Sequence, residues 1–249
     1  MQKYRIYFDT CENIKKNKVK NVKLMITSPP YWDLKNYEAK NQIGFNEDYQ
    51  TYLDRLYQVW KSTHDVLQKN GLAIININTK SFQSSLKLLP YDFIKQMQNI
   101  GFYFKDIHYW HKSSGIPATN NLKDNFEYFL IFSKSKKITH KKDIDYFDYK
   151  LNFKPSKSNI WNINKKFGSV GKKFMIHPAV FPVPYISRML KIFTDENDLI
   201  MDPFLGSGTT LISCMQNNRK FVGFELNNKE YKNLIKENLK SYKLDYKLV

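Results

Sequence analysis

The 249-residue sequence has no apolar run of the roughly 18 residues that a membrane-spanning helix needs. It has only two cysteines, Cys11 and Cys214, which are too few for a disulfide framework. The first residues also lack the apolar core of a secretion signal. These absences exclude membrane proteins and disulfide scaffolds, and we expect a protein of the reducing cytoplasm.

Arginine is scarce as well, because 36 of the 40 basic residues are lysine. The formal net charge is still +17, and such an excess of positive charge calls for an acidic partner, most commonly nucleic acid. About half of it lies between Lys134 and Lys173, where twelve lysines and three acids leave +9 among interleaved aromatic residues. Lysines and aromatic rings together are typical of surfaces that bind phosphates and bases. The candidate DNA contacts in this segment are Lys154, Lys157, Lys165, Lys166, Lys172 and Lys173.

Short apolar runs typical of strands alternate with segments in which apolar residues recur at helical spacing. This alternation indicates an α/β fold. One expected helix covers Asp48 to Gln68, with Gly71 placed to end it, and another covers Val183 to Phe193. The expected strands are Lys3–Phe8, Val22–Thr27, Leu72–Ile77, Gly101–Trp110, Phe126–Ser133, Asp198–Met201 and Lys220–Phe224.

A glycine turn follows the strand that ends at Met201. The sequence from Asp202 to Thr210, DPFLGSGTT, places Gly206 and Gly208 between a strand and a helix, where backbone can approach a ligand closely. About 20 residues after this turn, the next strand ends in Glu225, the position at which α/β nucleotide-binding folds hold a ribose. This pattern predicts a cradle for a small molecule that contains a ribose.

A second motif, Ser28-Pro29-Pro30-Tyr31, follows the strand Val22–Thr27. The two prolines make the segment stiff and leave its carbonyls available as hydrogen-bond acceptors. The Ser28 side chain and the Pro29 carbonyl suit an exocyclic amine of a base, and Tyr31 offers a flat face for stacking, which Trp32 would extend. The motif therefore predicts a pocket for an amine on an aromatic ring.

Together, the two motifs resemble the paired signature of the amino-methylating DNA methyltransferases of bacterial restriction-modification systems. The amine motif precedes the glycine turn, an order similar to the beta group of that family. The resemblance implies a Rossmann-like fold with a circularly permuted seven-stranded sheet, completed when the strand Lys3–Phe8 joins the C-terminal strands. It also implies S-adenosyl-L-methionine as cofactor, with no metal ion.

By this resemblance, residues 1–133 form the catalytic half, 134–176 a small basic target-recognition insert, and 177–249 the cofactor-binding half. Ser28, Pro29, Pro30 and Tyr31 are the expected catalytic residues, and Trp32 and the insert lysines the expected DNA contacts. Asp9 is either a cofactor contact or a helix N-cap. The expected cofactor contacts are Asp9, Phe181, Pro182, Asp202, Pro203, Phe204, Gly206, Ser207, Gly208, Thr209, Thr210 and Glu225.

Serine before Pro-Pro-Tyr favours methylation of cytosine N4, with adenine N6 as the alternative. A methyltransferase for RNA or protein glutamine, or an inactive DNA-binding relative, stays open as a further alternative. The expected partner is double-stranded DNA, and a cognate restriction endonuclease need not form a stable complex with the chain. No membrane partner is expected, and either a monomer or a homodimer is compatible with the sequence.

Overall fold

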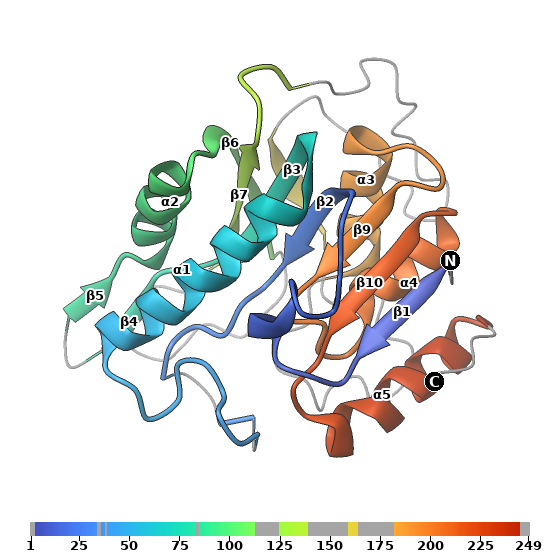
Figure 1. Cartoon of the computed structure of the whole chain (residues 1–249), viewed down its shortest axis with the longest axis horizontal. Coiled ribbons are helices and arrows are strands. Elements are labelled where there is room, and N and C mark those ends of the chain that lie inside the picture. The colour runs from blue at the N-terminus through green and yellow to red at the C-terminus, as the bar shows by residue number, and fades with distance from the viewer. Residues whose placement is uncertain are drawn as a thin grey trace.

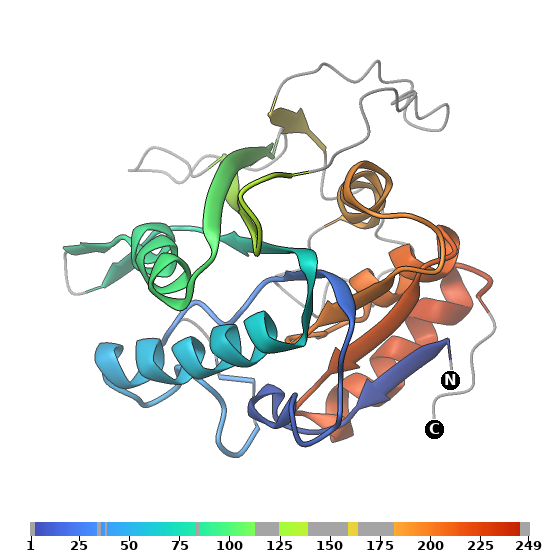
Figure 2. The ribbon, with the colours of Figure 1, turned by 45° about the horizontal axis from the view of Figure 1, so that its top comes forward.

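The computed structural model describes residues 3–33, 36–37, 39–82, 85–112, 125–138, 159–163 and 182–244. Within these ranges, an eight-stranded, mostly parallel sheet carries helices on both faces (Figures 1 and 2). Its strand order is β1-β10-β9-β2-β3-β7-β6-β8, and β7 runs antiparallel to both of its neighbours. The strands of this sheet are β1 (Tyr4–Tyr7), β2 (Val22–Thr27), β3 (Leu67–Ile77), β6 (Tyr103–His111), β7 (Phe126–Ser133), β8 (Ile160–Asn162), β9 (Leu199–Asp202) and β10 (Lys220–Phe224).

Two helical layers enclose the sheet. One face is covered by a short 3-10 helix, η1, and by α1 and α2, and the other by α3, α4 and α5. A small hairpin of β4 and β5 lies outside the main sheet. The bounds of these elements are η1 (Cys11–Asn13), α1 (Tyr49–Val66), β4 (Lys80–Phe82), β5 (Ser85–Lys87), α2 (Leu89–Ile100), α3 (Val183–Phe193), α4 (Thr209–Gln216) and α5 (Asn228–Ser241).

The N-terminal strand completes the C-terminal part of the sheet, as the permuted order requires. β1 pairs in parallel with β10, with Tyr4 opposite Phe221, and the backbone N–H of Phe221 donates to the Lys3 carbonyl at 2.9 Å. β2 pairs in parallel with both β3 and β9. The arrowheads of β1, β2, β9 and β10 therefore point to one edge of the sheet (Figure 1), which brings both sequence motifs to that edge.

The expected seven strands are all present, but the prediction of a seven-stranded sheet is wrong by one strand. The additional strand, β8, pairs in parallel with the outer edge of β6, where the N–H of Tyr109 donates to the Asn159 carbonyl at 2.8 Å. Trp161 of this strand is buried. Three residues are too few to show a strand period in sequence, and the strand is stabilised by the unpaired edge of β6. β8 lies within the segment 134–176 that the sequence assigns to the insert.

The placement of Gly71 as the end of the first long helix is also wrong. α1 begins after the N-cap Asp48 and ends at Val66, and Gly71 lies inside β3. The helix ends where Leu67 becomes extended and pairs with Val22 of β2. The Lys134 ammonium then donates to the carbonyls of His64 at 2.6 Å and Leu67 at 3.1 Å. A lysine distant in sequence thus satisfies terminal carbonyls that a local glycine was expected to satisfy.

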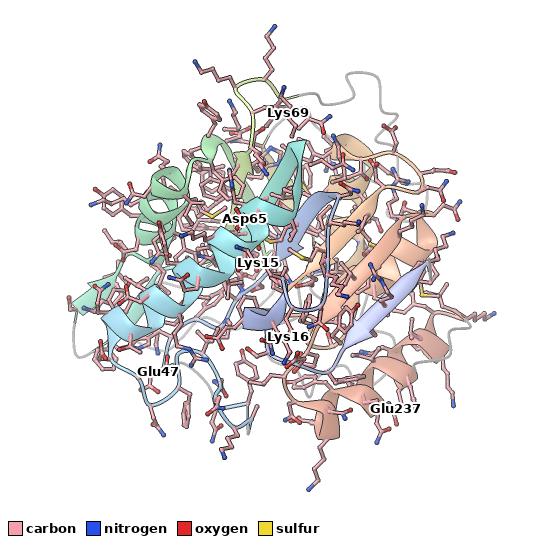
Figure 3. The ribbon with its side chains drawn as sticks, viewed as in Figure 1. Lys15, Lys16, Glu47, Asp65, Lys69 and Glu237 are labelled. Carbon is pink, nitrogen blue, oxygen red and sulfur yellow. The ribbon has the colours of Figure 1, made fainter. Side chains whose placement is uncertain are left out.

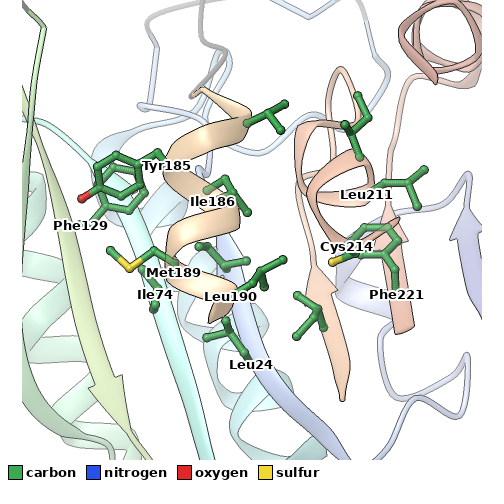
Figure 4. Close-up of a cluster of buried hydrophobic side chains, with 14 of the residues drawn as sticks. Leu24, Ile74, Phe129, Tyr185, Ile186, Met189, Leu190, Leu211, Cys214 and Phe221 are labelled. Carbon is green, nitrogen blue, oxygen red and sulfur yellow. The ribbon is translucent and has the colours of Figure 1, made fainter. Parts of the chain in front are cut away.

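The expected helix from Val183 to Phe193 is confirmed as α3, and its apolar side packs on the centre of the sheet (Figure 4). Tyr185 stacks on Phe129 of β7 with ring centroids 4.0 Å apart. Leu190 belongs to the same buried cluster as Leu211 of α4. Among the described residues, none of the helices combines the length and apolar character that crossing a bilayer requires.

Candidate functional site

A cavity of about 230 Å³ opens where the two sequence motifs meet. Its wall includes the amine motif after β2, the glycine turn after β9 and the carboxylate after β10. The predicted site residues that line it are Asp9, Ser28, Pro29, Pro30, Tyr31, Pro203, Phe204, Gly206, Ser207, Thr209 and Glu225. The structure therefore brings the two motifs together around one space, although more than 170 residues separate them in sequence.

The amine motif is held in place by side chains from neighbouring elements. Tyr52 of α1 donates its hydroxyl to the Pro30 carbonyl at 2.7 Å. The Tyr31 hydroxyl lies 3.3 Å from Glu127 Oε2 and 3.5 Å from Asn76 Oδ1. Burial and the nearby Glu127 carboxylate raise the pKa of Tyr31 well above its ordinary value, so its phenol stays protonated at neutral pH.

Three residues of this end of the cavity were missed by sequence reasoning: Asn76 of β3, Trp110 of β6 and Glu127 of β7. Glu127 forms an ion pair with Lys112, with its Oε1 2.6 Å from the lysine Nζ. A polar Asn76 at the end of an apolar strand was a usable signal, since buried strands rarely carry an amide without a role. Glu127 gave no comparable signal in its aromatic strand.

At the other end of the cavity, backbone N–H groups fix the Glu225 carboxylate. Gly206, with φ of +53°, donates to Oε2 at 2.8 Å, and Asn227 donates to Oε1 at 2.9 Å. Burial raises the pKa of Glu225 to about 7, against the opposing effect of these N–H donors. The carboxylate is thus oriented toward the cavity as an acceptor for hydroxyl groups of a ligand.

Asp202, a predicted cofactor contact, is not among the residues that line the cavity. Its carboxylate is buried and accepts from the Thr27 and Thr210 hydroxyls, each at 2.6 Å, and from the Phe204 N–H at 3.0 Å. Burial raises its pKa to about 6. Asp202 therefore joins the end of β2 to the glycine turn, and protein donors satisfy it.

Asp9 also lines the cavity, and it follows β1, the strand that pairs with β10. Its interpretation as a helix N-cap is wrong, because the N-cap of η1 is Thr10, whose side chain accepts from the Glu12 N–H. The Asp9 carboxylate instead accepts from the side-chain amides of Asn13 at 3.0 Å and Asn17 at 3.3 Å.

Four other predicted site residues lie outside the cavity wall. Gly208 has φ of +88° and caps α4, with Ile235 of α5 packed against it, while Thr210 contacts Asp202. Pro182 is the buried N-cap residue of α3. Trp32, expected to extend the stacking face, is only 6% exposed and donates its indole N–H to the Glu47 carbonyl at 2.9 Å.

Trp32 packs between Tyr49 and Phe82, with ring centroids 5.0 and 4.4 Å from its own. Of the two consecutive aromatic residues, Tyr31 faces the cavity and Trp32 faces the core, because consecutive residues of a turn point in different directions. The remaining predicted site residues lie outside the described ranges: Phe181, Lys154, Lys157, Lys165, Lys166, Lys172 and Lys173.

A loop between the amine motif and α1 forms a further wall that sequence reasoning missed. Tyr37, Asn41, Gln42 and Ile43 of this loop line the cavity. Asn227, two residues after Glu225, donates its side-chain amide to the Tyr37 carbonyl at 2.9 Å and joins the loop to the Glu225 end of the cavity. No periodicity marks these residues in sequence.

Arg55 of α1 holds this loop against the body of the protein. Its guanidinium donates to the Asn41 carbonyl at 3.0 Å and pairs with the carboxylates of Glu47 and Glu12. A third ion pair, between Lys15 and Asp65, joins the segment after η1 to α1 (Figure 3). The cavity wall is therefore braced from the α1 side of the sheet.

Comparison with known proteins gives consistent matches over most of the chain. A family model described as DNA methylase matches residues 22–237. The orphan methyltransferase M.BamHII of Bacillus amyloliquefaciens is 28% identical over 250 residues and covers 89% of each chain.

Among solved structures, TTHA0409 of Thermus thermophilus in complex with S-adenosyl-L-methionine is 25% identical, with a TM-score of 0.70, over 96% of this chain and 95% of that chain. The PvuII DNA methyltransferase, which is cytosine-N4-specific, has a TM-score of 0.75 at 21% identity over 99% and 90% of the two chains. At that identity the second similarity concerns the fold alone. The Rossmann-like methyltransferase fold expected from the sequence is confirmed.

Proposed function

The chain belongs to the DNA methylase family, and from this premise we propose that it methylates the exocyclic N4 amine of a cytosine flipped out of duplex DNA. Membership gives the coarser activity, that of an S-adenosyl-L-methionine-dependent DNA amino-methyltransferase of the restriction-modification type. The observation that carries the proposal is the shared cavity, which joins the amine motif to the ribose-type carboxylate.

The residues at the glycine turn fit the cofactor. The Glu225 carboxylate, held by two backbone N–H groups, would accept from the ribose hydroxyls, and Gly206 brings backbone close to the same space. Tyr37 and Asp9 supply neighbouring walls. S-adenosyl-L-methionine supplies an activated methyl group on a sulfonium sulfur, and the protein's part is to align an amine with it.

The amine end of the cavity would position the target base. The Ser28 side chain and the Pro29 carbonyl would accept the two amine hydrogens, and the ring of Tyr31 would stack on the base. Because the base must leave the duplex to reach this depth, the proposal includes base flipping. Serine at position 28 favours cytosine N4, and adenine N6 is the alternative that keeps the same cavity and the same residue roles.

DNA contact and base choice are proposed for the basic insert of residues 134–176, where lysine and asparagine outnumber arginine. Replacing Lys165 and Lys166 together by alanine should weaken binding to all DNA sequences and reduce the slope of log affinity against log salt by about 2. An unchanged slope, measured by fluorescence anisotropy, would remove these two lysines from the phosphate contacts.

The test of the proposed function is sequencing of DNA from cells that express the chain, by a method that detects methylated cytosine and methylated adenine. A single sequence motif carrying N4-methylcytosine is the expected result. The same motif carrying N6-methyladenine would overturn the choice of base and keep the reaction class. Unmodified DNA together with methylated RNA or protein glutamine would overturn DNA as the substrate, and absence of any methylation would favour an inactive DNA-binding relative.

In a restriction-modification setting, methylation protects host DNA at the sites that a cognate endonuclease cuts. We extend the proposal to this role, without a stable complex between the two proteins. Resistance of the modified DNA to digestion by an endonuclease of the same recognition motif is the expected outcome. The number of protein copies that act on the DNA is also open to test. Sedimentation of the complex with one recognition duplex gives its mass, which distinguishes a bound monomer from a bound homodimer.

A further inference from the structure

Amine methylation leaves a proton to be removed. When the amine nitrogen forms its bond to the methyl carbon, the bond from sulfur to that carbon breaks and the sulfonium becomes a neutral thioether. The positive charge passes to the nitrogen, which must then lose one N–H proton. The Ser28 to Tyr31 segment contains no carboxylate that could accept it.

Among the described residues that line the cavity, the carboxylates are Asp9, Glu127 and Glu225. Both oxygens of Glu225 are engaged by backbone N–H groups beside the glycine turn, and Asp9 accepts from two asparagine amides. Glu127 is the one of the three in contact with the amine motif, through the Tyr31 hydroxyl at 3.3 Å. Geometry therefore separates Glu127 from the two acids at the cofactor end.

Two hydroxyl groups, those of Ser28 and Tyr31, lie between the amine site and Glu127. The Ser28 side chain interacts with the Tyr31 hydroxyl, and both residues line the cavity. The Tyr31 hydroxyl in turn donates to Glu127 Oε2 at 3.3 Å. When the Ser28 hydroxyl donates its hydrogen to Tyr31, Ser28 still has a lone pair that can accept from an amine N–H. The Ser28 and Tyr31 hydroxyls would then each donate one hydrogen bond and accept another, which is the arrangement that a proton relay requires.

Charged and polar neighbours surround Glu127, the last group in this series of hydrogen-bonding side chains. The Lys112 ammonium at the end of β6 lies 2.6 Å from Oε1, and both side chains are largely buried, at 13% exposed for Lys112 and 15% for Glu127. On β3, Asn76 anchors its amide to the Tyr128 carbonyl at 3.2 Å while its Oδ1 faces Tyr31. Glu127 is thus held by Lys112 and Tyr31, while Asn76 contacts Tyr31 from the other side. Among the described residues, Glu127 has no hydrogen bond to the glycine turn or to Glu225.

We propose that Glu127 accepts, through the hydroxyls of Tyr31 and Ser28, the proton that the target amine loses on methylation. The amine proton passes to Ser28, the Ser28 proton to Tyr31, and the Tyr31 proton to Glu127, which is neutralised and later releases it to water. This inference rests on the proposed function, but it is independent of whether the amine belongs to cytosine or adenine.

The test compares Glu127→Gln with the wild type in single-turnover methyl transfer, with the DNA that the wild type methylates. Glutamine keeps an acceptor for Tyr31 but takes up no proton, so the rate should fall about 100-fold while the Kd for S-adenosyl-L-methionine and for DNA stay within about threefold. Glu127→Asp should restore part of the rate, and added formate should accelerate Glu127→Ala. Tyr31→Phe, which keeps the ring and breaks the relay, should lose about as much rate as Glu127→Gln.

Two controls separate the relay from a structural effect. Glu196→Gln, the same replacement at an exposed site between α3 and β9, should leave the rate unchanged. In protein labelled with ¹³C at tyrosine Cζ, Glu127→Gln should shift the Tyr31 resonance without any cofactor or DNA, and Glu196→Gln should not. A Glu127→Gln or Tyr31→Phe rate within about threefold of the wild type, or an unshifted Tyr31 resonance, would overturn the relay, whereas a wild type that methylates no DNA would overturn the proposed function instead.

Discussion

At the end of the cavity proposed for the cofactor, the glycine turn and the carboxylate that it holds lie near one another in sequence, as when Gly206 N–H contacts Glu225 across 19 positions. At the catalytic end, Tyr31 meets Asn76 and Glu127 across 45 and 96 positions. The first end is fixed mainly by backbone donors and glycine conformations, and the second by contacts between side chains. We therefore expect changes at the cofactor end to alter binding and folding, and changes at the catalytic end to alter rate.

The largest expected effect is that of Tyr31→Ala, which removes the stacking face. Single-turnover methylation should fall about 1,000-fold, since base stacking contributes up to about 3 kcal/mol and alignment of the amine is lost as well. The affinity for S-adenosyl-L-methionine, measured by isothermal titration calorimetry, should change less than about threefold. Tyr91→Ala is the matched control, because Tyr91 is 56% exposed on α2. Equal loss of rate and cofactor affinity in Tyr31→Ala would remove the distinction between the two ends.

Gly208→Ala tests the backbone at the cofactor end. A side chain at φ of +88° is strained, and its Cβ would lie 3.3 Å from Ile235, so the free energy of unfolding should fall by about 2 to 3 kcal/mol. Gly101 also has a positive φ, of +112°, but a Cβ there would have only His64 near it, at 3.8 Å. Gly101→Ala should therefore lower the free energy of unfolding by only about 1 kcal/mol. Urea denaturation measures both, and equal costs would show that packing against α5 contributes nothing.

Thr27→Val removes the hydrogen bond that joins the two ends through Asp202. The valine is nearly isosteric, but the buried carboxylate loses a donor at 2.6 Å, so we expect a loss of about 2 kcal/mol in the free energy of unfolding. Thr63→Val is the control, since the buried Thr63 hydroxyl has no hydrogen-bond partner among the described residues, and this change should be neutral or stabilising. If the two variants are equally stable, the junction at Asp202 does not stabilise the fold.

The smallest effect concerns pH. The pKa of Glu225 is raised to about 7 in the unliganded protein, and ribose hydroxyls donate best to the ionised carboxylate. Below pH 7 the cofactor must displace a proton, so its affinity should rise about tenfold from about pH 6 to about pH 8, with proton release on binding. Glu225→Gln should bind more weakly and lose this part of the pH dependence. Calorimetry in buffers of different ionisation heat measures the released proton, and an identical pH profile in the variant would contradict the assignment.

Much of the fold could be predicted because its signals are local. All seven expected strands and the helix α3 are present. They could be predicted because the spacing of apolar residues and the position of a glycine can be read within one short segment. The two errors have a common cause. α1 ends where Leu67 pairs with Val22 of β2, and β8 forms by pairing with the edge of β6. Each of these partners lies far away in sequence.

Three features could be read directly from the sequence: the order of the motifs, the strand that precedes each motif, and the residues of the glycine turn. It also indicated Glu225, because spacing along one strand-turn-helix unit is encoded locally. Only the tertiary structure decided that Asp202 joins two strands, that Trp32 turns into the core, and that Glu127 meets Tyr31. The physical reason is that a side chain's partners depend on which strands become neighbours and which face each residue occupies, and long-range packing decides both.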